Sequence, residues 1–186
     1  MKKIISLEGA WAGGKTSILR KIQERGFKVF YSVVPTIYEA KGRDTYCPRD
    51  DPKEFTELFL KLKEGQYIRA LADNDLAFFD RVFFAPIVLR KFLGLEIPGY
   101  FYDLAKNAGI VNPVFLIEPI PLEKHKHGWP RKHFSYEESL RYHNITEEII
   151  TELGFKIYKV AYSPIIDERV EDILKVIEQQ PKGGEK

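Results

Sequence analysis

The stretch LEGAWAGGKTS, residues 7–17, decides the fold of this chain, because it joins a short apolar run to a glycine-rich turn and a helix start. Gly9 and Gly14 stand five positions apart, with Lys15 and Thr16 directly after the second glycine. This is the G-x-x-x-x-G-K-[ST] spacing, in which glycines let backbone N–H groups converge on phosphate oxygens at a helix N-terminus. The stretch therefore predicts a strand, a phosphate-binding loop and a helix, in that order.

Each residue type in this loop has a chemical role. Lys15 can reach the β- and γ-phosphates of a nucleoside triphosphate, and the Thr16 hydroxyl can ligate Mg²⁺. Chance agreement with the motif is rarer than about one in a hundred at average residue usage. For Trp11 two interpretations stay open, shielding of the phosphates or ordinary packing. Nucleotide binding is assigned to Gly9, Ala10, Trp11, Ala12, Gly13, Gly14, Lys15, Thr16 and Ser17.

The rest of the chain alternates strand and helix signals, which favours an α/β fold with a parallel sheet and helices on both faces. Apolar runs typical of strands occupy 2–8, 27–34, 75–80, 112–118 and 155–162. Helical patterns occupy 15–25, 51–73, 82–94, 98–109, 135–154 and 167–179. The stretches 39–52 and 119–134 lack periodicity and are expected to be loops. We expect one domain over 1–180 and a flexible tail over 181–186.

Composition and net charge limit the classes of binding partner that the chain is expected to have. The 186 residues are 44% hydrophobic and 30% charged, as in soluble globular proteins. A net charge of +2 is too small for a general polyanion-binding surface, so nucleic acid is not an expected partner. The apolar runs fall short of the roughly 20 residues that a membrane span needs. The single cysteine, Cys47, excludes an intrachain disulfide, and a cytoplasmic location is expected.

A second acidic group ends a neighbouring apolar strand. Residues 76–80 read LAFFD, four apolar residues followed by Asp80. In a phosphate-loop protein such a carboxylate helps to hold Mg²⁺, so Thr16 and Asp80 are the predicted metal ligands. Arg81 follows directly, and an Asp-Arg pair suits an anionic or hydroxylated acceptor. Two alternatives stay open: Asp80 caps the next helix, or Arg81 is only its ion-pair partner.

Missing motifs and a late basic segment favour transfer of the phosphoryl group over switching or motor work. The N/T-K-x-D and D-x-x-G motifs of GTP switches are absent from the sequence. Phosphoryl transfer needs positive charge over the transferring group and exclusion of water. The proline-rich, basic stretch at about 119–135 is therefore predicted to be a lid, and Arg131 is its candidate catalytic cation.

The chain resembles the small AAA-type ATPase/kinase family that includes the ribosylnicotinamide kinase domain of the bacterial NAD-metabolism regulator. More distantly it is similar to thymidylate and deoxynucleoside kinases. The resemblance rests on EGAWAGGKTS at 8–17, FFDR at 78–81, and the stretch from VFLIEPIP at 114–121 to ERVEDIL at 168–174. It implies a five-stranded sheet of order 2-3-1-4-5 and Mg-ATP as donor. It also implies an acceptor pocket roofed by the loop after the second strand and by the long helix, with Glu39 as approximate counterpart of an acidic residue after that strand.

Together these features predict a P-loop kinase that transfers the γ-phosphoryl of Mg-ATP to a small hydroxylated acceptor, a nucleoside or a nucleotide. Lys15 and Arg131 would stabilise the transferring group, and Glu39 or Asp80 would take the acceptor proton. Glu39, Asp80 and Arg81 would bind the acceptor. The alternative is a regulatory ATPase module with slow hydrolysis and a protein partner. ATP and GTP both stay open as donor, and so do a monomer and a homodimer.

Aromatic residues gather in the segments expected to face the acceptor. They make up 13% of the chain. One interpretation is core packing, and the other is a stacking pocket for a nucleobase or nicotinamide ring. The candidates for stacking are Tyr31, Tyr38, Phe83, Tyr100 and Tyr102.

Overall fold

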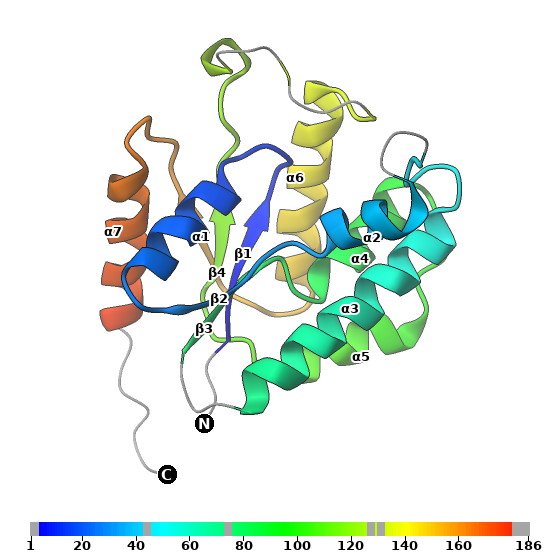
Figure 1. Ribbon diagram of the computed structural model, residues 1–186, viewed down its shortest axis with the longest axis horizontal. Coiled ribbons are helices and arrows are strands. Elements are labelled where there is room, and N and C mark those ends of the chain that lie inside the picture. The colour runs from blue at the N-terminus through cyan, green and yellow to red at the C-terminus, as the bar shows by residue number, and fades with distance from the viewer. Residues whose placement is uncertain (1–3, 43–45, 73–75, 126–128, 130–132, 180–186) are drawn as a thin grey trace.

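A five-stranded parallel sheet with helices on both faces forms the centre of the molecule (Figure 1). The computed structural model describes residues 4–42, 46–72, 76–125, 129 and 133–179. The strand order β2-β3-β1-β4-β5 confirms the order that the family resemblance implies. The strands are β1 (Ile4–Gly9), β2 (Lys28–Phe30), β3 (Ala77–Asp80), β4 (Val114–Ile117) and β5 (Ile157–Val160).

The helices form two layers, one on each face of the sheet. The strand residues Ile5 and Leu7 pack with residues of α1 and α7, whereas Ile4 packs in a second core with residues of α3, α4 and α6. This alternation follows from the two-residue period of β1. The helices of the described residues are α1 (Lys15–Glu24), α2 (Val34–Lys41), α3 (Pro52–Ala72), α4 (Phe84–Phe92), α5 (Gly99–Asn107), α6 (Tyr136–Glu152) and α7 (Ile166–Glu178), with a short 3-10 turn η1 (Leu122–Lys124).

Parallel pairing brings the loop after β1 and the acid at the end of β3 to the same end of the sheet. Leu7 pairs with Asp80, and Gly9 pairs with Ile117. The carboxyl ends of β1, β3 and β4 therefore lie next to one another, which is where open α/β sheets bind ligands.

The second strand and its connection differ from the prediction. A strand was expected over 27–34, but β2 ends at Phe30, and a helix not predicted from the sequence, α2, begins at Val34. Pro35 lies in the first turn of that helix, where a missing N–H costs nothing. Val33 and Ile37 are both buried and stand four positions apart, so this segment packs against the core with one face of a helix.

The predicted bounds of the domain, 1–180 with a tail over 181–186, stay a prediction. All described strands join a single sheet, while 180–186, and with them the predicted tail, lie outside the described residues. Among the helices that the structure describes, none combines the length and the apolar character that crossing a membrane requires.

Candidate active site

The loop between β1 and α1 has a backbone that only particular residues can adopt. Gly9, Ala12 and Gly14 have left-handed φ angles of 115°, 54° and 86°. At Gly9 a side chain is also sterically excluded, because a Cβ would lie 2.6 Å from the carbonyl oxygen of Ile117. The glycine therefore allows both the turn and the close approach of β4.

Two cations converge on two carbonyl oxygens of this loop. The buried Lys15 ammonium donates to the carbonyls of Gly9, at 3.3 Å, and Ala10. The Arg81 Nη2 donates to the same oxygens, at 2.9 Å and 3.4 Å respectively. Arg81 can therefore keep both carbonyls hydrogen-bonded when Lys15 moves toward a phosphate.

Thr16 and Asp80 lie in contact as the metal-site prediction expects. Asp80 is buried at the end of β3, and its Oδ2 lies 3.4 Å from the Thr16 hydroxyl. Its Oδ1 is also buried and has no hydrogen-bond partner among the described residues. A hydroxyl and a carboxylate are hard oxygen donors of the kind that Mg²⁺ prefers, and Oδ1, which accepts no hydrogen bond from the described residues and lies 3.8 Å from Arg81 Nη1, has a lone pair for it. The residues present therefore fit Mg²⁺.

Glu8 holds the turn that carries Asp80 and Arg81. Its buried carboxylate accepts from the Ser6 hydroxyl, at 2.6 Å, and from the Val82 N–H, at 2.9 Å. Arg81 itself has a left-handed φ of 58°, which these bonds from β1 stabilise. Burial raises the pKa of Glu8, against the hydrogen bonds that lower it. Glu8 was not among the predicted site residues, although a carboxylate inside an apolar strand is a visible signal.

Lys63 lies fully buried on α3, against the ends of two strands. Its ammonium donates to the Asp80 carbonyl at 2.8 Å, to the Tyr31 carbonyl at 3.3 Å and to Gln66 Oε1 at 2.9 Å. Burial lowers its pKa to about 7, although the charges of Asp80 and Glu8 raise it. Sequence reasoning missed this residue, because a lysine within a long helix is normally solvated.

We expect the protein without nucleotide to become more stable between pH 7 and 9 because of Lys63. Its pKa of about 7 in the folded state lies below the ordinary value of 10.5, so the unfolded chain binds more protons in this window. Rising pH then favours the folded state by up to about 1.4 kcal/mol per pH unit. In urea unfolding, the gain from pH 7 to 9 should be about 2 kcal/mol larger for the wild type than for Lys63→Met. Equal gains in both proteins would contradict this assignment.

A cavity of about 810 Å³ opens from the phosphate loop toward α2, α3 and α4. It is lined by the loop residues from Trp11 to Ser17 and by a second set of aromatic and aliphatic side chains. The second set comprises Val34, Pro35, Tyr38, Pro48, Phe55, Phe59, Ala85, Pro86, Leu89, Ile120, Phe134 and Tyr142. The other side chains that line it are polar: Ser32, Asp80, Arg81 and His133.

Trp11 both packs against α6 and lines this cavity. Its ring stacks on Phe134, with centroids 4.1 Å apart, and tilts against Tyr142 at 4.4 Å. Its carbonyl accepts from the Ser139 hydroxyl at 3.1 Å. The loop is thereby joined to the N-terminal half of α6, which begins with a capping box at Ser135.

The cavity brings together most of the predicted site residues. Asp80 and Arg81 line it with the loop, whereas Glu39 is an exposed residue of α2 that does not line it. Arg131 lies outside the described residues, as do residues 126–128, 130 and 132 of the predicted lid. Among the aromatic candidates Tyr38 lines the cavity, while Phe83 is buried in the core. The roles given to all of these residues stay predictions.

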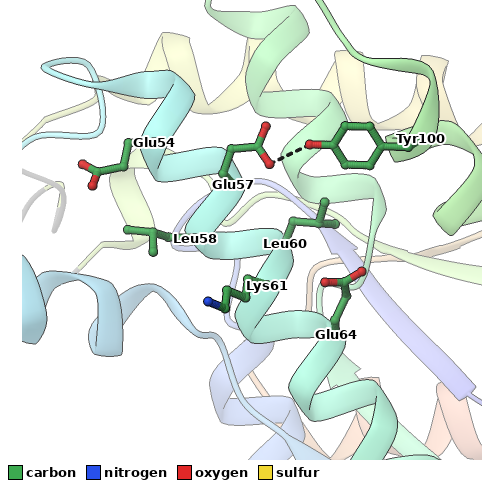
Figure 2. A pocket seen from close by; sticks show the side chains of 7 residues that line it. All are labelled: Glu54, Glu57, Leu58, Leu60, Lys61, Glu64 and Tyr100. Atoms are coloured by element: carbon green, nitrogen blue, oxygen red, sulfur yellow. Dashed lines mark hydrogen bonds between the residues drawn. The ribbon is translucent and has the colours of Figure 1, made fainter.

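A second pocket, of about 440 Å³, lies between α3 and Tyr100 of α5 (Figure 2). It is lined by Glu54, Glu57, Leu58, Leu60, Lys61, Glu64 and Tyr100. The carboxylate of Glu57 is already bonded, to the Tyr100 hydroxyl at 2.6 Å and to Arg90 at 2.8 Å. Phe55 and Phe59 of the same helix line the first cavity. Helical spacing places most of the second pocket's residues on the opposite side of α3.

A family model and several solved structures match this chain. The family model for the AAA domain matches residues 4–169. No curated protein matches the chain by sequence.

Solved structures of three kinds resemble the chain in fold. Deoxyadenosine kinase from M. mycoides superposes with a TM-score of 0.67 and 16% identity over 95% of this chain and 98% of its own. The NadR protein in complex with NR superposes with a TM-score of 0.68 and 16% identity over 100% of this chain but only 53% of its own. Thymidylate kinase from Ehrlichia chaffeensis superposes with a TM-score of 0.64 and 12% identity over 95% of this chain and 100% of its own.

Proposed function

The chain belongs to the AAA domain family, and from this premise we propose that it is a kinase. The reaction would transfer the γ-phosphoryl of ATP to a hydroxyl of a nucleoside or nucleotide. The observation that supports the proposal is the single cavity lined both by the phosphate loop and by aromatic side chains, in which a donor on the loop and an acceptor ring would lie in contact. The similar deoxyadenosine kinase and thymidylate kinase structures support the same class.

The donor end would work through the loop and two cations. The loop N–H groups and the N-terminus of α1 would bind the phosphates. Lys15 would leave the carbonyls of Gly9 and Ala10 for the γ-phosphate, while Arg81 keeps those carbonyls bonded. Mg²⁺, when bound to Thr16 and Asp80, would neutralise charge on the β- and γ-oxygens. Arg131 is proposed as a further cation over the transferring group.

The acceptor end is suited to a flat ring that carries a hydroxyl group. Tyr38, Phe55 and Phe59 contribute aromatic surface to the cavity, and Asp80 lines the same cavity. Asp80 is therefore better placed than the exposed Glu39 to orient the hydroxyl and take its proton. Because the transition state of phosphoryl transfer is loose, orientation matters more than the strength of the base.

The proposal is tested with a panel of nucleosides and nucleotides in the presence of Mg-ATP. We expect one acceptor class to raise ADP release at least about tenfold, because a productive acceptor displaces water from the transferring group. Mass spectrometry should find that acceptor one phosphoryl group heavier. A parallel reaction with GTP decides the donor. ADP release that no acceptor changes, together with nucleotide-dependent binding of a protein, would favour a regulatory ATPase module instead.

A further inference from the structure

Arg169, near the start of α7, lies directly behind the phosphate loop. It is 2% exposed, its Nη1 donates to the Gly13 carbonyl at 3.1 Å, and its Nη2 donates to the Glu118 carbonyl at 3.2 Å. A Cβ built on Gly14 would lie 3.1 Å from the same Nη1, so the guanidinium touches the residue that precedes α1. One side chain thus connects α7, the end of β4 and the loop.

The positive charge of Arg169 has no ion-pair partner among the described residues. It contacts Glu118 through the backbone oxygen, while the Glu118 carboxylate lies 3.7 Å from His143 Nε2. Burial lowers the Arg169 pKa, and the charges of Tyr162 and Glu118 oppose this only in part. Its Nε is buried and lacks a hydrogen-bond partner within the described chain. A buried cation without an anion is costly, so this one points to an anion that arrives from outside.

The surroundings of the guanidinium add to the positive potential. It lies at the N-terminus of α1 and within the first turns of α7, where the helix dipoles are positive. Lys15 begins α1 on the other side of Gly14. Arg81, which holds the loop carbonyls at the opposite end, differs in having Asp80 3.8 Å away. The two carboxylates in the first turn of α7 are engaged elsewhere: Asp167 pairs with Arg25 at 3.3 Å, and Glu168 accepts from the Ser163 hydroxyl at 2.5 Å.

We propose that Arg169 is a positioning residue for polyphosphate binding. It holds the Gly13 carbonyl toward the protein interior, so that the loop N–H groups face the phosphates, and the bound polyphosphate supplies the anion that its charge lacks. The proposal rests on the proposed function only in requiring that a nucleoside polyphosphate occupies the loop. It requires no acceptor and no transfer.

Calorimetric binding of ATP, ADP and adenosine to Arg169→Met tests this role. Methionine keeps much of the side-chain length but removes the charge and both hydrogen bonds. We expect ATP and ADP to bind about 10- to 100-fold more weakly, as when one partner of a buried charged contact is truncated. Adenosine affinity should change less than about twofold, since the effect depends on the phosphates. The matched control is Lys175→Met, which removes an exposed charge from the same helix and should leave all three affinities unchanged.

Arg169→Lys separates the effect of the positive charge from that of the two hydrogen bonds. It also tests the proposal if the methionine variant does not fold. A single ammonium retains the charge but cannot reproduce the two-pronged contact, so ATP should bind about three- to tenfold more weakly. ATP affinity equal to that of the wild type in either variant would overturn the proposal, and so would equal losses for ATP and adenosine. If the wild type binds ATP yet phosphorylates no acceptor, the proposed function fails while this test remains decisive.

Discussion

Replacement of Lys15 by alanine is expected to lower acceptor-dependent ADP release by about 100- to 1000-fold, the loss typical of removing one preorganised donor to a transition-state charge. Lys15 is the first residue of α1, and its ammonium lies against the carbonyls of the loop that is expected to bind the phosphates. Its removal should hardly affect folding, because Arg81 continues to donate to the carbonyls of Gly9 and Ala10. The measurement is the initial rate of ADP release at saturating Mg-ATP and acceptor.

The matched control for this variant is Lys21→Ala. Lys21 belongs to the same helix, but its side chain is 42% exposed and forms a surface ion pair with Glu24 at 2.9 Å. Its loss should leave the rate within about twofold, since exposed ion pairs contribute little. A Lys15→Ala protein that turns over at the wild-type rate would show that the loop is not the phosphate site of the reaction.

Asp80→Asn is the second substitution with a large expected effect, a loss of about 100-fold or more in the same rate. Asparagine keeps the shape and the contact with Thr16 but removes the charge that would hold Mg²⁺ and orient the acceptor. A neutral amide oxygen is a much weaker ligand for a small divalent cation than a carboxylate. The Mg²⁺ concentration for half-maximal rate should therefore rise, together with the fall in maximal rate.

A readout that does not involve turnover accompanies the Asp80 variant. Mn²⁺ binding to the protein–ADP complex, followed by paramagnetic resonance, should weaken in Asp80→Asn and stay unchanged in Asp103→Asn. Asp103 is an exposed carboxylate on α5 and serves as the control for loss of one negative charge. Unaltered metal affinity in Asp80→Asn would remove Asp80 from the metal site and leave it only the acceptor role.

Features that depend on neighbouring residues were predictable from the sequence. The loop 9–16 was predictable, since its glycines, its lysine and its threonine act within one turn of chain. The strand that ends at Asp80 was predictable for the same reason, as four apolar residues lead to one acid. The short β2 and the helix α2 were not, because Val33 and Val34 suit either element and only their packing decides between them.

By itself the sequence determined that a phosphate loop follows β1, that an acid ends β3, and that strands and helices alternate, because all three are local patterns. Tertiary structure alone decided which distant groups meet that loop. Glu8 binds the Val82 N–H, Lys63 binds the Asp80 carbonyl, and Arg169 binds the Gly13 carbonyl across 156 positions of chain. Glu8 stands out locally as an acid in an apolar strand, but nothing local marks Lys63 or Arg169, since a lysine or arginine in a helix is ordinarily solvated. Only the parallel register and the packing of α3 and α7 against the sheet bury their charges beside the site.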